Sequence, residues 1–327
     1  MVQLTHVTAP TSGGAVPGPD VLAAVRSAFP DVTWQRVHFP DQGLDHHVAV
    51  LSGVSGIAGV EDVGDRSPTV VARLAIAPGV VGRADVEAGV LAAVDRRAPA
   101  PVPVALATDS DSLTLARHIP GEPLSDAVWA SLDDSRRRTI AAHLAGTLDA
   151  VHGLDPAEPM LAGVGASWFP VKHAKLTDAV ASHVLPVLDG RDADATRAIM
   201  EQAETTFIRE PVSPRLVHGD LHETHLRWDG GADAGGAGTS FGLIDFSDMT
   251  LADPAIDVAH LSGISPELHR RVISDLAAAD EDLERRAGIY SRWDAVFLLA
   301  DHLTTGRTPE TTARALFGRA LESIRGL

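Results

Sequence analysis

Residues 216–248 constrain the fold of this chain more than any other segment, because they hold two short apolar runs that each lead to an aspartate. The first run ends at Asp220 and the second at Asp245, and residues 230–240 between them are rich in Gly and Ala. Apolar, β-branched runs bounded by turn residues are typical of short buried strands. We therefore expect a two-stranded hairpin, with each aspartate at the point where a strand opens into a loop.

Two carboxylates brought together in this way predict a phosphoryl-transfer site. Asp220 would orient an attacking hydroxyl and take its proton, although a lone aspartate can also cap a turn. Asp245 would hold Mg²⁺ against the donor phosphates, because a buried carboxylate needs a partner; an ion pair with an arginine is the alternative. His218 is expected to fix the catalytic loop through the backbone, and Asp257 to support that loop by accepting from its amides.

The remaining pattern predicts an α+β, protein-kinase-like fold of two lobes. Residues 1–118 would form a nucleotide-binding lobe with a small antiparallel sheet, and residues 119–327 a larger, mostly helical lobe with the catalytic loop and the acceptor pocket. A connector with Pro and Gly, residues 119–123, separates them. Strands are expected twice within 34–54 and at 69–74, 104–106 and 113–118, and helices at 21–29, 85–94, 135–152, 174–185, 193–207, 265–279 and 282–304.

The first lobe offers candidates for nucleotide binding. Arg73 ends a β-branched strand and Glu87 lies on the next helix, so the glutamate would hold a cation near the α- and β-phosphates. A solvated strand end is the alternative for Arg73. Gly43 and Asp45 fall in the hairpin that would cover the phosphates. A nucleobase edge would meet the backbone at the end of the last strand, at Ala116, Arg117 and His118.

The composition narrows the function further. A formal net charge of −17 argues against nucleic-acid binding, and it either maintains solubility or suits a cationic small substrate. The absence of cysteine excludes disulfides and cysteine-ligated metals. The N-terminal residues lack the features of a signal peptide, and the longest apolar stretches are too short to span a bilayer. We therefore expect a cytoplasmic protein that does not bind membranes.

The run His218-Gly219-Asp220-Leu221-His222, followed by Ile244-Asp245-Phe246, resembles the hallmark of the antibiotic phosphotransferase superfamily. Within it the sequence is most similar to the macrolide 2′-phosphotransferases, through residues 43–48, 243–248 and 253–257, through Arg73 and through His225. The resemblance extends over about residues 37–303. Two Gly-rich inserts, 52–67 and 230–240, depart from it, as does Glu223-Thr224 in place of the common Pro-Gly.

The resemblance implies transfer of the γ-phosphate of GTP, or of ATP, to the 2′-hydroxyl of a macrolide amino sugar, with Mg²⁺ as cofactor. We also expect the protein to be a monomer. His225 stands where aminoglycoside enzymes and protein kinases place Asn. Because Mg²⁺ prefers oxygen ligands, His225 would bind the metal weakly, act through a metal-bound water or contact a phosphate; a turn histidine is the alternative.

The acceptor pocket is expected beside Asp220 and Glu223, with Trp293 and Phe297 of the last predicted helix against the macrolactone. Ordinary core packing is the alternative for the two aromatic residues. Two other functions stay open. One is a related kinase for an aminoglycoside, an amino alcohol or a sugar. The other is an inactive kinase-like binding module, against which the intact Asp220 and Asp245 argue.

Overall fold

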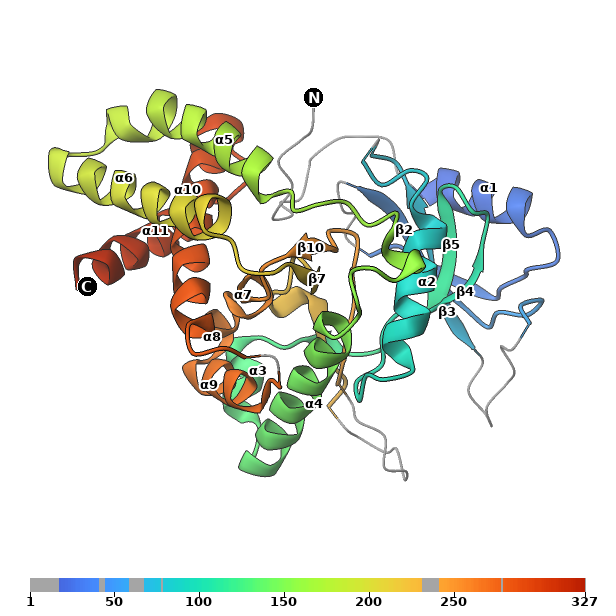
Figure 1. Ribbon diagram of the computed structural model, residues 1–327. Helices are drawn as coiled ribbons and strands as arrows, with labels where there is room; N and C mark the ends of the chain where they lie inside the picture. Colours follow the sequence, from blue (N-terminus) through green and yellow to red (C-terminus); the bar gives the residue numbers. More distant parts are fainter. Residues whose placement is uncertain are drawn as a thin grey trace.

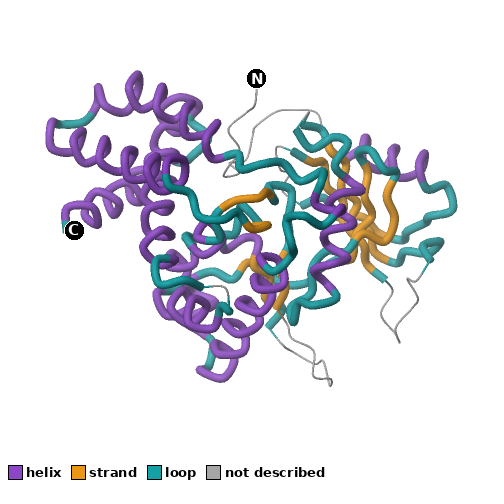
Figure 2. Tube along the Cα trace, in the orientation of Figure 1, coloured by secondary structure: helices purple, strands orange, loops and turns teal. Residues whose placement is uncertain are grey.

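A five-stranded antiparallel sheet forms the N-terminal part of the protein (Figures 1 and 2). The computed structural model describes residues 18–40, 45–58, 68–77, 79–230, 241–277 and 279–326. The strand order is β1-β2-β3-β5-β4, with β1 at Arg36–His38, β2 at His46–Ser52, β3 at Thr69–Ala75, β4 at Ala105–Thr108 and β5 at Leu113–Arg117. Five strands in these positions are what the sequence predicts.

Alternation along β3 decides which side chains reach the centre of the molecule. Val70 and Ala72 are buried with Ala49 and Leu51 of β2, beneath helix α1 at Gly18–Ala28. Successive side chains of a strand point to opposite faces. Arg73 therefore points away from α1, toward the rest of the chain.

Helix α2 (Ala84–Asp95) lies on the side of the sheet that faces the C-terminal part (Figure 1). Its buried residues Val90, Leu91 and Val94 belong to the large core of the C-terminal part and not to the core beneath α1. Hydrophobic packing of α2 therefore joins the two parts.

The C-terminal part is mostly helical, and the α+β kinase-like architecture expected from the sequence is confirmed. The long helix α10 (Leu283–Thr305) packs against α5, α6, α7 and α11. The other helices are α3 Asp126–Ser131, α4 Asp134–His152, α5 Phe169–Ala179, α6 Gly190–Glu204, α7 Ala255–Val258, α8 Leu261–Ile264, α9 Pro266–Asp275 and α11 Glu310–Arg325, with π-helical turns at Val180–Val184 and Thr205–Arg209 and 3₁₀ turns at Pro159–Leu161, Leu185–Val187 and Glu223–His225.

The strands around the two aspartates pair differently from the expected hairpin. β7 (Arg215–Val217), which precedes Asp220, pairs with β10 (Thr250–Ala252). β9 (Phe241–Leu243), which precedes Asp245, pairs with β8 (Leu226–Trp228), and β8 also pairs with β6 (Glu122–Pro123). The expectation missed β8, because the chain turns after Asp220 and forms a strand with buried ends before the Gly-rich insert.

Helix α11, which follows Pro309, was also missed. Its buried face consists of Ala313, Phe317, Ala320 and Leu321, whose helical spacing could have identified it. Among the described residues, no helix combines the length and the apolar character that crossing a membrane requires.

Candidate active site

The loop that carries Asp220 is held in place by backbone geometry and by a buried carboxylate. Gly219 has φ +87°, and a Cβ there would lie 2.3 Å from the carbonyl oxygen of Asp248, so the position requires glycine. The backbone N–H groups of His218 and Gly219 each donate to Asp257 at 2.9 Å. These contacts aim the next residue, Asp220, out of the loop.

Asp257 is itself fixed by a residue that sequence reasoning did not identify. Nε2 of His152, on α4, lies 2.9 Å from Oδ2 of Asp257, and both side chains are almost fully buried. Burial opposes ionisation, but the hydrogen bond and the charge of His152 hold the pKa of Asp257 below its usual value. No spacing in the sequence connects these two residues, because they come from elements far apart in the chain.

His218 links the two aspartate loops. Its Nε2 lies 2.9 Å from the carbonyl oxygen of Ile244, and its Nδ1 accepts from the backbone N–H of Asp220 at 3.3 Å. The proton of the imidazole therefore lies on Nε2, because the carbonyl can only accept. One buried ring thus sets the position of Asp220 relative to the strand end before Asp245.

His225 occupies the space between the two carboxylates. Its Nδ1 lies 2.7 Å from the carbonyl oxygen of Asp220 and must donate to it, which leaves the lone pair on Nε2. Nε2 lies 3.6 Å from Oδ2 of Asp245. Burial lowers the pKa of His225 to about 4, against the opposing effect of both carboxylates. The ring is therefore uncharged at neutral pH.

Asp245 adopts a backbone conformation that is uncommon for a residue with a side chain, with φ +64°. Its Oδ1 accepts from Oγ of Ser247 at 2.7 Å and from Nη2 of Arg73 at 3.2 Å. Burial opposes ionisation, but the charge of Arg73, reinforced by His225, holds the pKa of Asp245 well below its usual range. The carboxylate is therefore ionised at neutral pH.

Arg73 joins the sheet to the catalytic loops. It donates to Glu87 of α2 as well as to Asp245, and its side chain is 12% exposed. Burial and the charge of Arg73 lower the pKa of the neighbouring His46 to about 3, so that this imidazole is neutral. A single guanidinium therefore contacts residues of α2 and of the loop after β9.

The side chains around Asp245 fit a divalent cation. Two ligand atoms that each lie about 2.1 Å from one ion are roughly 3–4 Å from each other. Oδ2 of Asp245 and Nε2 of His225, which has a free lone pair, are 3.6 Å apart. Next to this pair, ligand atoms of Asp220, His222 and His225 all lie within 4.8 Å of one another. Asp245 would supply the oxygen that Mg²⁺ prefers, and His225 a weaker nitrogen ligand.

The other residues that were predicted to bind the nucleotide have different surroundings in the structure. Asp45 precedes β2 and its charge acts on Arg73, whereas Gly43 lies outside the described residues. Ala116 is buried at the end of β5, and burial lowers the pKa of His118. The N–H of Arg117 already donates to the carbonyl of Val104 at 2.9 Å, so that amide is used within the sheet.

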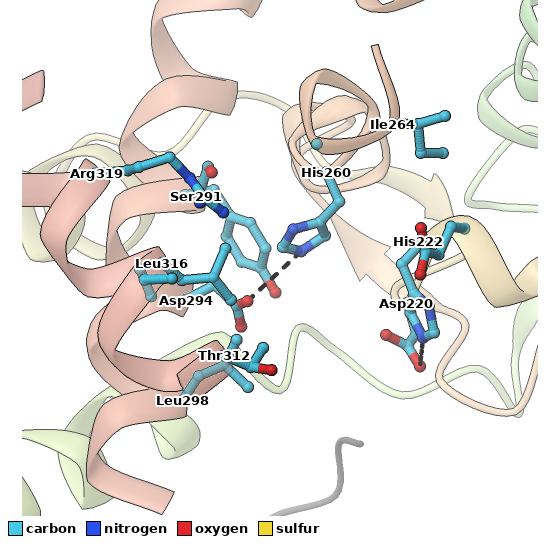
Figure 3. Close-up of a pocket in the computed structure, with 15 residues that line it drawn as sticks. Asp220, His222, His260, Ile264, Ser291, Asp294, Leu298, Thr312, Leu316 and Arg319 are labelled. Carbon is cyan, nitrogen blue, oxygen red and sulfur yellow. Dashed lines mark ion pairs between the residues drawn. The ribbon is translucent and has the colours of Figure 1, made fainter. Parts of the chain in front are cut away.

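A cavity of about 390 Å³ opens beside Asp220 (Figure 3). Glu223 lines it, as the sequence predicts for the acceptor pocket. Its wall contains three carboxylates together with apolar side chains. The lining residues are Asp220, His222, Glu223, His260, Gly263, Ile264, Tyr290, Ser291, Asp294, Ala295, Leu298, Thr312, Ala315, Leu316 and Arg319.

Trp293 and Phe297 lie elsewhere. They are 1% and 3% exposed, and Trp293 packs against Phe169 and donates to His173 at 3.2 Å. In this structure the two side chains belong to an aromatic core, and neither lines the 390 Å³ cavity. The face of α10 that lines it is instead the one with Asp294 and Leu298.

The cavity wall contains side chains that were not identified from the sequence, among them His260, Tyr290 and Asp294. Nε2 of His260 lies 3.9 Å from Oδ2 of Asp294 across the cavity wall (Figure 3). Tyr290 is buried beside them, and burial together with the charges of Asp294 and Asp220 raises its pKa well above the usual value. These residues carry no motif, and the packing of α10 against α7 brings them near Asp220.

Several solved structures share this architecture. The GDP and kanamycin complex of the aminoglycoside phosphotransferase APH(2″)-IIIa is 21% identical, with a TM-score of 0.69 over 94% of this chain and 97% of that one. Macrolide 2′-phosphotransferase MphH from Brachybacterium faecium is 18% identical, with a TM-score of 0.57 over 92% and 98%. A macrolide 2′-phosphotransferase type I is also 18% identical, with a TM-score of 0.58 over 95% and 99%.

Sequence comparison identifies the family. No curated protein matches the chain significantly. The model of the phosphotransferase enzyme family matches residues 53–290, a range that includes Arg73, both aspartate loops and Asp257. With its kinase-like fold and its paired aspartates, this chain belongs to the phosphotransferase enzyme family.

Proposed function

We propose that this protein transfers the γ-phosphate of GTP, or of ATP, to the 2′-hydroxyl of a macrolide amino sugar. The observation that carries the proposal is the position of Asp220. Its carboxylate lines the 390 Å³ cavity, and its backbone is hydrogen-bonded to His218 and His225. His218 also contacts the carbonyl oxygen of Ile244, and His225 lies next to Asp245. A hydroxyl in the cavity would therefore lie between a base and a nucleotide–metal site.

The chemistry assigned to the chain is mainly positioning. Asp220 would accept the hydrogen bond of the acceptor hydroxyl, aim its lone pair at the γ-phosphorus and take the proton as the new O–P bond forms. His218 and His225 would hold the backbone of Asp220 in place through its N–H and its carbonyl oxygen. Mg²⁺, bound by Asp245 and His225, would neutralise charge on the phosphates. Arg73, held by Glu87, would add a cation near the phosphates.

The walls of the cavity support a macrolide acceptor. Asp220, Glu223 and Asp294 supply carboxylates for the protonated dimethylamino group beside the 2′-hydroxyl. Apolar side chains from three helices, Ile264, Leu298 and Leu316, would bury part of the macrolactone at about 25 cal/mol per Å² before ordering costs. A single amine next to a large apolar ring matches this mixture.

An aminoglycoside is the second candidate. The same three carboxylates would favour a polycation, and APH(2″)-IIIa was solved with kanamycin. Comparing kcat/KM for erythromycin and for kanamycin separates the two. We expect erythromycin to be preferred, and a preference for kanamycin would favour the second candidate. Competition between GTP and ATP tests the donor, with GTP expected to give the higher kcat/KM.

A further inference from the structure

A second cavity, of about 580 Å³, adjoins the acceptor pocket. It lies among α8, α9, α10 and α11, and its wall shares His260, Ser291 and Arg319 with the wall of the first cavity. A ligand whose hydroxyl is at Asp220 can therefore extend toward it. In Figure 3, Arg319 lies beside Ser291, on the side of the pocket away from Asp220.

The charge of this second cavity is opposite to that of the chain. Acidic residues outnumber Lys and Arg by 44 to 27 in the sequence. In the cavity wall, Arg270, Arg292 and Arg319 face one carboxylate, that of Glu284. Of the two histidines in the wall, His269 bonds the carbonyl of Val258 through Nδ1, and burial lowers its pKa. Nε2 of His260 lies 3.9 Å from Oδ2 of Asp294.

None of the three arginines forms an ion pair with a described residue. Two other arginines of the helix that carries Arg292 do form ion pairs. Arg285 pairs with Asp282, and Arg286 pairs with Asp253 and Asp280. Of the three cavity arginines, Arg270 and Arg319 are exposed and Arg292 is half-buried.

Arg292 is the most informative of the three. It donates only to neutral oxygens, Oγ of Ser323 at 3.3 Å and Oε1 of Gln202 at 3.2 Å, and its Nε is buried without a hydrogen-bond partner. Burial without a counter-charge lowers the pKa of Arg292. A half-buried charge without a counter-charge is costly, and an anion in the cavity that Arg292 lines would offset that cost.

We propose that this cavity is an anion-binding subsite of the acceptor site, which takes a phosphate, sulfate or carboxylate group. The part of the proposal that concerns the acceptor rests on the proposed function. An acceptor would place its amine among the carboxylates near Asp220 and its negatively charged or oxygen-rich end at Arg292 and Arg319. A polycation with amines at both ends would be repelled, so the subsite discriminates against aminoglycosides.

Calorimetry with inorganic phosphate at constant ionic strength tests the subsite without any turnover. We expect phosphate to bind the wild type, and Arg292→Gln and Arg319→Gln to weaken it at least about tenfold, because each removes a charge-assisted contact. The matched control is Arg314→Gln, an exposed arginine on α11 that pairs with Glu310, and it should leave the affinity unchanged. Thermal unfolding and nucleotide binding report whether the variants are folded.

Phosphate that binds equally well to the two variants and to the control would place the anion at the nucleotide site and overturn the proposal. So would a lack of measurable binding. These outcomes do not depend on which acceptor is phosphorylated, and failure of macrolide turnover alone would contradict only the proposed function.

Acceptor kinetics distinguish an anion carried by the acceptor from a free anion beside it. If the subsite belongs to the acceptor site, phosphate raises the KM for the acceptor competitively in the wild type and not in Arg319→Gln. The same variant should lower the KM for kanamycin several-fold. An acceptor KM that does not respond to bound phosphate, or a kanamycin KM that is unchanged, would show that the cavity is separate.

Discussion

Arg73 and Asp245 form an ion pair that connects strand β3 to the loop after β9, with 3.2 Å between Nη2 and Oδ1. The same carboxylate is the proposed oxygen ligand of Mg²⁺. The guanidinium therefore offsets a charge that Mg²⁺ would also offset. Glu87 also accepts from Arg73 and so helps to hold the guanidinium beside Asp245.

Asp220→Asn should abolish phosphate transfer while leaving the nucleotide affinity within a few-fold of the wild type. The change removes the base and keeps the shape, and loss of a general base typically lowers kcat by about 100-fold or more. Steady-state kinetics and nucleotide titration measure the two quantities. Asp178→Asn, an exposed aspartate on α5, is the matched control. A mutant with more than about a tenth of wild-type kcat would contradict the assigned role.

Asp245→Asn should lose Mg²⁺-dependent nucleotide binding together with activity, because the amide is a poorer partner for the metal. Calorimetry of nucleotide binding with and without Mg²⁺ reveals the difference. For the wild type, we expect Mg²⁺ to tighten binding strongly. An equally large effect of Mg²⁺ in the mutant would remove Asp245 from the metal site.

His225→Asn should keep substantial activity, because Asn supplies an oxygen ligand at the same position. It should also flatten the dependence of stability on pH. The pKa of His225 is about 4 in the folded protein, below the usual 6.5, so the unfolded chain binds the extra proton between these values. Stability is thus fully present above pH 6.5 and is lost as the pH falls toward 4, by up to about 3 kcal/mol.

Thermal unfolding between pH 7.5 and 4.5 tests this expectation. The wild-type Tm should fall more steeply with acid than that of His225→Asn. His46 contributes in the same direction in both proteins, since its pKa is lowered to about 3. Identical slopes would show that His225 is not the titrating group, and complete inactivity of a folded mutant would mean that the imidazole itself contacts phosphate.

Asp257→Asn should lower both kcat and the free energy of unfolding. The carboxylate accepts from two catalytic-loop amides and from His152, and each such bond to a charged group is worth about 1.5–3 kcal/mol. Asp301→Asn is the control, because Asp301 is equally buried but bonds Thr308 and Arg307 near the end of α10. It should reduce stability without reducing kcat, and equal effects on kcat would argue against a positioning role for Asp257.

The elements that contain the catalytic motifs were predictable because their signals are local. Short apolar runs identify β2, β3 and β5, and the apolar run before each aspartate identifies the loops. Pairing was less accessible, because which strand lies beside β9 depends on the turn after Asp220 and not on the apolar pattern. Nothing in the sequence of the Gly-rich insert indicated whether β7 or β8 would pair with β9.

The acceptor pocket was the least predictable part. Trp293 and Leu298 both lie on α10, and its apolar residues extend around so much of the helix that the sequence does not distinguish core from cavity. The cavity forms where residues of α8 and α11 meet one face of α10, and α11 packs directly against α10. Contacts such as those of His152 with Asp257, and of His260 with Asp294, join residues far apart in the chain, so no sequence spacing predicts them.

Mass spectrometry of erythromycin, incubated with the purified protein, GTP and Mg²⁺, tests the central claim most directly. We predict the addition of one phosphate, located on the amino sugar by fragmentation, in wild type but not in Asp220→Asn, and no addition to erythromycin whose 2′-hydroxyl is blocked. Unmodified erythromycin under conditions where kanamycin is phosphorylated, or phosphorylation of the blocked compound, would contradict it.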